Sequence, residues 1–246
     1  MDVAHLLRAV AANTGKTGVV DSSDLTAAGV LRRLEQHASE AEAAKIGKRV
    51  AADEPVIGVR MGTLFEIAKE STALPDDELE RLFAAAEYEA RLAAFCILDF
   101  RARRRLGDPA LCATYLRHHD RITTWDIVDR AAPRVVGAAV AGGPYDVLYE
   151  LAAATNPLRR RTAITAPLWF TRTGDKADLD AGFSVAARLH ADREPVVHNA
   201  VGIFLAYAGE RDPAQLDVFL DAHADAMPRP ALRLATRKRR ARDRDR

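Results

Sequence analysis

The strongest constraint on the fold is the spacing of apolar residues, which recur three and four positions apart along most of the chain. The pattern is clear over residues 63–70, 79–100 and 180–189, where Ala, Leu, Arg and Glu are frequent. These residue types favour helices, and this spacing places apolar side chains on one helical face. Alternating strand patterns are almost absent. The sequence therefore predicts an all-α protein.

Turn residues interrupt the helical pattern at short intervals. They are Pro75, 107–109, 142–144, Asn156-Pro157, Gly174-Asp175, Glu194-Pro195 and Asp212-Pro213. Asp108-Pro109 and Asp212-Pro213 are typical of an N-cap followed by proline in the first helical turn. Helix pairs recur roughly every 35–42 residues, a period typical of stacked helical hairpins. We expect HEAT-like helical repeats in a curved α-solenoid with a basic concave face; a compact helical bundle is the alternative.

Composition narrows the functional class. The 246-residue chain is 48% hydrophobic, enough for one large or two small domains. It has no apolar run long enough to span a membrane and no signal-peptide pattern, so we expect a cytoplasmic protein. Cys96 and Cys112 lack zinc spacing, and Cys96 lies in an apolar run typical of a buried thiol. Gly15-Lys16-Thr17 lacks the earlier glycine of a phosphate-binding loop, so no cofactor is expected.

Charge is distributed unevenly along the chain. Residues 1–100 carry 11 Lys and Arg against 17 Asp and Glu, whereas residues 101–246 carry 25 against 18. Basic runs occupy residues 101–105, 159–161 and 237–246. This asymmetry indicates binding to a polyanion; the alternative is that these runs are solvated helix ends and a tail.

The segment 122–137, ITTWDIVDRAAPRVVG, carries the most chemistry. Thr123 and Asp126 have capping-box spacing, which gives Asp126 a structural role. Asp129 lies four residues after Trp125, so the two side chains share one helical face. Pro133 cannot donate to the carbonyl of Asp129, and we expect a kink there. An acid and an indole beside a kink indicate a functional site; alternatively, Trp125 fills a core and Asp129 pairs with an arginine.

Five stretches of the chain carry a resemblance to a known family. They are IGVRMGTLFEIAKE (57–70), DRITTWDIVDRAAPRVVG (120–137), RRTAI (160–164), VHNAVG (197–202) and MPRPALR (227–233). In this order they resemble the AlkD-type DNA alkylation repair glycosylases, a HEAT-like repeat family, over residues 22–238. The resemblance implies that duplex DNA binds in a basic concave cleft. It also implies hydrolysis of the N-glycosidic bond of cationic N3- or N7-alkylated purines without base flipping, unlike other glycosylases.

The resemblance also implies roles for individual residues. Asp129 matches the catalytic aspartate, Trp125 the aromatic one turn before it, and Arg161 the arginine of the cleft. We take four further residues as candidate DNA contacts: Arg159, Arg160, Thr124 and His198. The implied partner is duplex DNA containing alkylated bases, bound by a monomer that is associated with the nucleoid. We expect an N-terminal extension (1–21), a repeat domain (22–238) and a disordered basic tail (239–246).

Three positions depart from the family pattern. Ile203 stands where a second cleft tryptophan is usual, Ala206 where a basic residue is usual, and Leu158 where another tryptophan is usual. Isoleucine offers no π face to a cationic sugar, which reduces the expected rate. A DNA glycosylase is the leading hypothesis. The alternatives are a DNA-binding paralogue with weak or no activity and a helical-repeat scaffold for protein partners.

Overall fold

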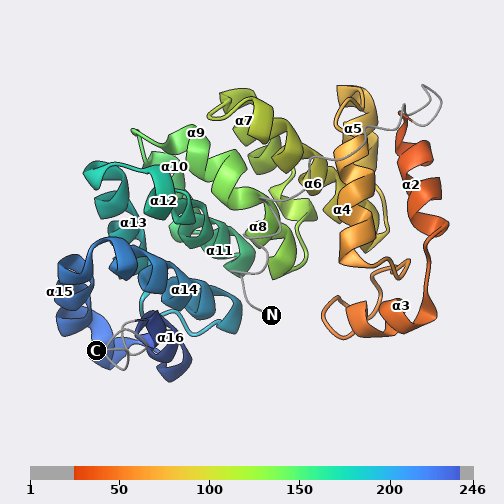
Figure 1. Cartoon of the computed structure of the whole chain (residues 1–246). Helices are drawn as coiled ribbons and strands as arrows, with labels where there is room; N and C mark the ends of the chain where they lie inside the picture. The colour runs from red at the N-terminus through yellow and green to blue at the C-terminus, as the bar shows by residue number, and fades with distance from the viewer. Residues whose placement is uncertain (1–24, 239–246) are drawn as a thin grey trace. The chain divides into compact units, whose positions relative to one another are not determined.

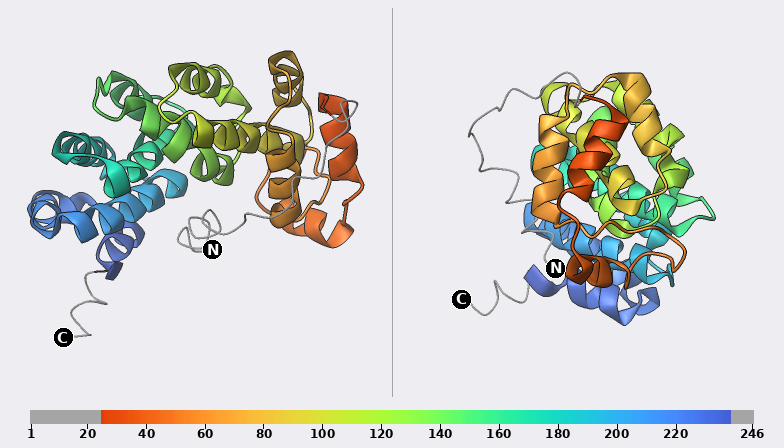
Figure 2. Two further views of the ribbon diagram at one scale, coloured as in Figure 1. Left: turned by 45° about the horizontal axis from the view of Figure 1, so that its top comes forward. Right: turned by 90° about the vertical axis from the view of Figure 1, so that its right-hand side faces the viewer.

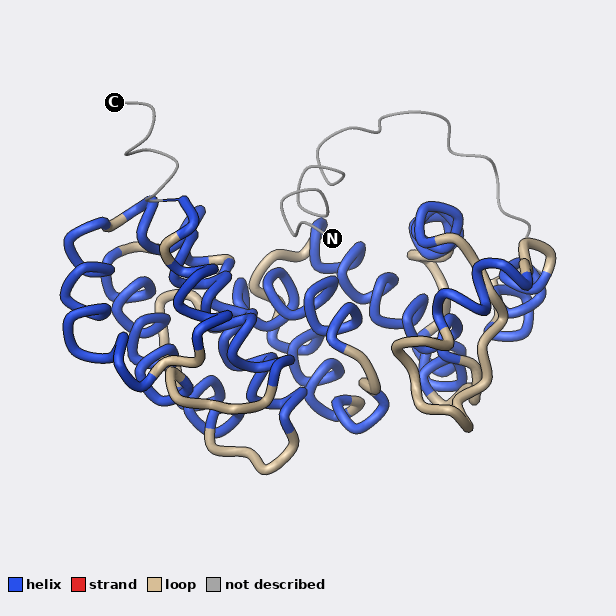
Figure 3. The backbone as a smooth tube through the Cα atoms, turned by 90° about the horizontal axis from the view of Figure 1, so that it is seen from below, coloured by secondary structure: helices blue, strands red, loops and turns tan. Residues whose placement is uncertain are grey.

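The computed structural model describes residues 25–238, and every regular element in that range is a helix (Figures 1 and 3). The all-α class predicted from apolar spacing is confirmed, and the succession of packed helices is consistent with an α-solenoid. Within residues 25–238, no helix is both long and apolar enough to cross a membrane. The predicted extension (1–21) and tail (239–246) lie outside the described residues.

The chain divides into two compact units. Among the described residues, unit 1 comprises 25–105 with Ala113–Ala131, and unit 2 comprises Leu106–Cys112 with 132–238. The α-helices from α2 to α8 are α2 (Ala27–Glu35), α3 (Glu40–Ile46), α4 (Met61–Glu70), α5 (Asp76–Phe83), α6 (Tyr88–Arg104), α7 (Pro109–Arg117) and α8 (Trp125–Ala132). The later α-helices are α9 (Ala138–Val140), α10 (Asp146–Ala152), α11 (Pro157–Thr165), α12 (Phe170–Thr173), α13 (Lys176–Leu189), α14 (Pro195–Arg211), α15 (Pro213–His223) and α16 (Arg229–Ala235). The single domain predicted over 22–238 stays a prediction.

Helix α6 is the core of unit 1. It packs against α2, α4 and α5, and its residues are buried almost all the way round. Phe95 of α6 meets Phe83 edge-to-face at 4.8 Å between ring centroids and Tyr115 at 5.5 Å. The polar side chains of a helix that is buried on every side need hydrogen-bond or charge partners within the protein. The buried ion pairs described below provide such partners.

Helix α14 is the core of unit 2. It packs against α11, α13, α15 and α16, and Figures 1 and 2 show α16 beside it. Gly202 permits the close approach of α16, because a Cβ at that position would come within 2.5 Å of the carbonyl oxygen of Ala231. Two helices therefore meet backbone to backbone at this glycine.

The N-caps predicted from Asp-Pro pairs are confirmed. Asp108 accepts a hydrogen bond from Ala110 N at 2.8 Å, with α7 beginning at Pro109. Asp212 accepts from Gln215 N at 2.9 Å, with Pro213 in the first turn of α15. Both cysteines are free and buried, and burial raises the pKa of the Cys96 thiol to about 12, as expected for an inert core thiol.

Candidate functional site

Helix α8 carries two stripes of residues with different surroundings. Trp125 and Asp129, four positions apart, are half-buried. Asp126 and Arg130, also four positions apart, are only 6% and 8% exposed. Since residues four apart lie above one another on a helix, α8 has one face towards the surface and a polar face towards the core. The two aspartates of this segment therefore have different environments.

Asp126 is held by groups from three parts of unit 1. The Tyr88 hydroxyl donates to Asp126 Oδ2 at 2.6 Å, and Arg49 Nη2 lies 3.3 Å from the same oxygen. The Thr124 hydroxyl and Ile127 N donate to Asp126 Oδ1. Burial and the neighbouring Asp126 carboxylate raise the pKa of Tyr88 far above its usual value, so the phenol stays a donor. These bonds confirm the structural role expected for Asp126.

Arg130 is the second buried anchor of α8. Its Nη2 lies 3.1 Å from Oδ2 of the fully buried Asp99, which also accepts from Arg103 at 3.4 Å. The Arg130 guanidinium lies over the rings of Phe65 and Phe100, at 4.3 and 4.9 Å from their centroids. Because Asp126 and Arg130 are both fixed, α8 cannot rotate about its axis. The contacts of Asp126 and Arg130 therefore fix the direction in which the Trp125–Asp129 face points.

The start of α8 differs from the prediction. The capping box of Thr123 with Asp126 is wrong: the helix begins at Trp125, so Thr124 takes the cap position. The Thr123 hydroxyl instead donates to Glu54 Oε1 at 2.6 Å, and Glu54 also pairs with the buried Arg91. The sequence gives no sign of Glu54, which lies 69 residues from Thr123 in the chain. This bond ties the segment before α8 to another part of unit 1.

The backbone changes at Pro133, as the sequence indicated. A π-helix, Pro133–Gly137, follows α8 directly, and Ala138 N–H bonds the carbonyl of Pro133. Pro133 lacks the N–H that would bond the carbonyl of Asp129, so the regular helical ladder ends at the candidate carboxylate. Gly137 is required in this turn, because a Cβ there would come within 2.2 Å of the carbonyl oxygen of Ala166. Single π-turns of this kind often occur at functional sites.

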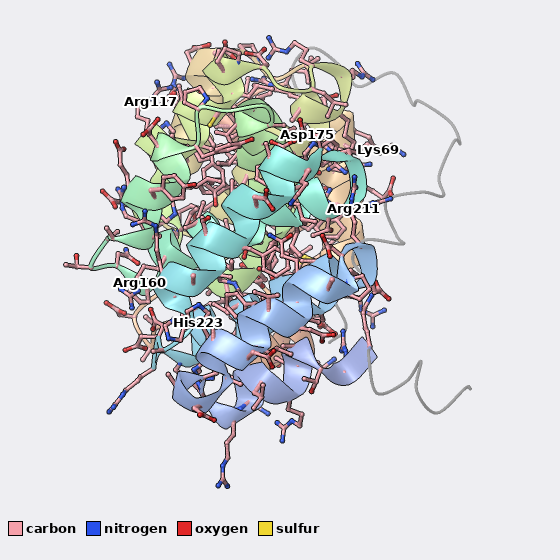
Figure 4. The ribbon with its side chains drawn as sticks, turned by 90° about the vertical axis from the view of Figure 1, so that its left-hand side faces the viewer. Lys69, Arg117, Arg160, Asp175, Arg211 and His223 are labelled. Carbon is pink, nitrogen blue, oxygen red and sulfur yellow. The ribbon has the colours of Figure 1, made fainter. Side chains whose placement is uncertain are left out.

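The arginines of residues 159–161 lie in unit 2 and have different environments. Arg160 donates to Asp192 and to the carbonyls of Ala154 and Thr155, so its guanidinium holds the turn before α11 and the loop before α14. Arg161 is 4% exposed and donates to the carbonyl of Val196 in the first turn of α14. Arg159 is half-buried. Figure 4 shows Arg160 well separated from Arg211, the last residue of α14.

The remaining candidates also divide between buried and half-buried positions. Thr124 is 3% exposed, and its hydroxyl bonds Asp126. His198 is 7% exposed in the first turns of α14, and its Nδ1 has no hydrogen-bond partner among the described residues. Ile203 and Leu158, which replace the expected tryptophans, are half-buried. The convergence of the two groups of candidates on one face stays a prediction from the sequence.

No group of three His, Cys, Asp or Glu side chains suited to a metal ion occurs within residues 25–238. The functional groups that α8 itself supplies are the half-buried carboxylate of Asp129 and the half-buried indole of Trp125, next to the buried Asp126 and Arg130. Such a carboxylate can stabilise a developing cation or take a proton from water.

Comparisons with known proteins indicate the family of the chain and a solved structure with a similar fold. The family model described as DNA alkylation repair enzyme matches residues 30–238. Among curated proteins, no sequence matches the chain. A solved structure, described as a predicted DNA alkylation repair enzyme from Enterococcus faecalis, matches with a TM-score of 0.63 at 17% identity. The match covers 81% of this chain and 95% of that one, and at this identity it concerns the fold alone.

Proposed function

The chain belongs to the DNA alkylation repair enzyme family, and we propose that it hydrolyses the N-glycosidic bond of cationic N3- or N7-alkylated purines in duplex DNA. The observation that carries the proposal is the half-buried pair Trp125 and Asp129 on a helix whose neighbouring face, about 100° round the axis, is held by Asp126 and Arg130. A rigid helix that presents one carboxylate is suited to a reaction that needs a fixed anion.

The positive charge of the leaving group explains why one carboxylate would be sufficient for hydrolysis of this bond. Ordinary glycoside hydrolysis uses two carboxyl groups, one of which protonates the leaving group. An alkylated purine already carries a positive charge and departs as a neutral base, so no general acid is required. The sugar that remains has oxocarbenium character. Asp129 would stabilise that cation and orient or deprotonate the attacking water.

Trp125 and Arg161 would assist without joining the bond-breaking step. The indole of Trp125 lies one helical turn before Asp129 and would attract the cationic sugar through its π face. The phosphate contact that the resemblance assigns to Arg161 would require its guanidinium to leave the carbonyl of Val196, because the side chain is 4% exposed. The base would stay in the helix because the contacts are to the backbone and sugar. The protein would act as a monomer without a cofactor.

The proposal is tested by incubating the full chain with a duplex that contains one N7-methylguanine. The expected result is release of the free methylated base, which leaves an abasic strand that alkali cleaves. The same duplex with unmodified guanine is the control and should remain intact. Tight duplex binding with no base release would support the second candidate, a DNA-binding paralogue, which the loss of the aromatic at Ile203 favours.

Replacing Ile203 by tryptophan should increase the rate of excision. Ile203 is half-buried on α14 and stands where the resemblance places a tryptophan of the cleft. A cation–π contact contributes about 0.5–2 kcal/mol, which corresponds to roughly two- to thirty-fold in rate. The measurement is single-turnover base release. Val218→Trp, at a residue 70% exposed in the same unit, is the matched control and should leave the rate unchanged; an unchanged rate in Ile203→Trp would contradict the role inferred for this position.

A further inference from the structure

Helix α16 has an arginine stripe on the side away from its packing partner. Ala231 and Ala235 are 0% and 1% exposed and form the packed side, where α16 meets α14 at Gly202. Arg229, Arg233 and Arg237 follow one another at intervals of four residues, and all three are exposed. Arg229 and Arg233 each lie two residues from Ala231, which places them on the opposite side of the helix. We call these three residues the α16 arginine stripe.

No described carboxylate forms an ion pair or hydrogen bond with any arginine of the stripe. Neighbouring cations are used differently: Lys238 pairs with Glu210, and Arg211 donates to the carbonyl of Gly174 at 2.6 Å. Like charges four positions apart destabilise a helix by about 0.2–0.5 kcal/mol for each pair. Because Arg233 lies in the last turn of α16, where the helix dipole favours a cation, this repulsion is offset and the stripe contributes little to the stability of the fold. Binding of an anion gives the three exposed arginines a role that the fold itself does not.

Lys238, which directly follows the stripe in the chain, contacts the side of α14 that carries Ile203. Tyr207 lies four residues after Ile203 and is half-buried like it, so the two share one side of α14. Lys238 Nζ lies 3.7 Å from the centroid of the Tyr207 ring, directly after Arg237 in the chain. At the other end of this side, Arg161 bonds the carbonyl of Val196. One continuous side of α14 thus has cationic residues at both ends, all within unit 2.

We propose that the α16 arginine stripe binds successive phosphates on one strand of duplex DNA. Arg229 and Arg233 lie four residues apart on α16, a rise of about 6 Å that equals the axial rise of about two phosphates on one strand, and Arg237 follows two residues after the helix ends. Guanidinium groups bind phosphate through paired N–H donors, and exposed arginines do so without breaking bonds inside the protein. The inference rests on the proposed function for the identity of the polyanion, but it needs no base excision.

The test measures binding of undamaged duplex DNA to the full chain as a function of salt concentration. Each phosphate contact contributes about 0.9 to the slope of log affinity against log salt. The triple variant Arg229→Gln, Arg233→Gln and Arg237→Gln should therefore reduce that slope by about 2.7. Arg172→Gln is the matched control for loss of an exposed arginine on a helix of unit 2, and it should retain the wild-type slope.

An unchanged slope in the triple variant would overturn the inference. A reduction of about 0.9 in Arg172→Gln would also overturn it, because that is the effect expected from the loss of one positive charge anywhere on the protein. Failure of the wild-type chain to bind duplex DNA would overturn it too. Thermal unfolding of the triple variant should match that of the wild type, because the three side chains are exposed. Release of methylated base tests the proposed function separately. A protein without glycosylase activity would release no base, whereas a stripe that does not contact DNA would leave the salt dependence of the triple variant unchanged.

Discussion

Replacing Asp129 by asparagine should abolish measurable base excision while the protein still folds and binds duplex DNA. Asparagine keeps the shape of the side chain but carries no negative charge, so it neither stabilises a cationic sugar nor accepts a proton from water. Loss of a group in such a role typically costs about 100- to 10,000-fold in rate. Removal of a negative charge beside phosphates leaves DNA affinity equal or slightly higher.

The measurement is base release under single turnover, together with duplex affinity and thermal unfolding of the same preparations. Asp221→Asn provides the matched control, since Asp221 is an exposed aspartate on α15. That variant should excise at the wild-type rate. An Asp129→Asn protein that retains excision while Asp221→Asn behaves as wild type would show that another residue performs the chemistry.

Replacing Asp126 by asparagine should instead destabilise the fold strongly. The carboxylate is buried and receives hydrogen bonds from Tyr88 and Thr124, with Arg49 at 3.3 Å. Loss of one partner of a buried, charge-assisted network costs about 3–5 kcal/mol, and the partial exposure of Arg49 places this case near the lower end. For a chain of this length, that loss lowers the melting temperature by roughly 6–12 °C.

Thermal unfolding followed by circular dichroism measures the effect. Tyr88→Phe removes one of these hydrogen bonds and should give a smaller decrease, about 1.5–3 kcal/mol. Tyr149→Phe is the control, because Tyr149 meets Arg188 through its ring, which phenylalanine keeps. If Asp126→Asn melted at the wild-type temperature, the account of α8 as a helix fixed from behind would be wrong.

The fold class could be predicted because it depends on local patterns. Apolar spacing identified the helices, and Asp-Pro pairs marked the starts of α7 and α15. Pro133 predicted a break in the helix because it lacks an N–H group, and a π-helix begins there. These features depend on residues within a few positions of one another, so they can be read in the sequence.

The network behind α8 could not be predicted, because its members are far apart in the chain. Tyr88 lies 38 residues before Asp126, and Glu54 lies 69 residues before Thr123. Asp99 is buried against Arg130, and nothing in its local sequence marks it as a partner. Tertiary packing alone brings these groups together. The capping box is wrong because α8 begins at Trp125, one residue later than a cap at Thr123 requires.

The division between Asp126 and Asp129 could be predicted in part. The sequence placed Asp129 and Trp125 on one face and gave Asp126 a structural role, and the burial of Asp126 agrees. Arg160, Arg161 and Thr124 were expected to contact DNA, and the structure shows their polar groups bonded within the protein. The two arginines bond residues that are far from them in the chain, so the spacing of residues in the sequence could not predict these bonds.

The central claim is that the half-buried carboxylate of α8 performs the chemistry and the buried one does not. The most direct test is the single-turnover rate of N7-methylguanine release from duplex DNA, measured for the wild type and for Asp129→Asn below the melting temperature of both. The account predicts a rate at least about 100-fold lower in the variant at equal occupancy of DNA. Equal rates for the two proteins would contradict it.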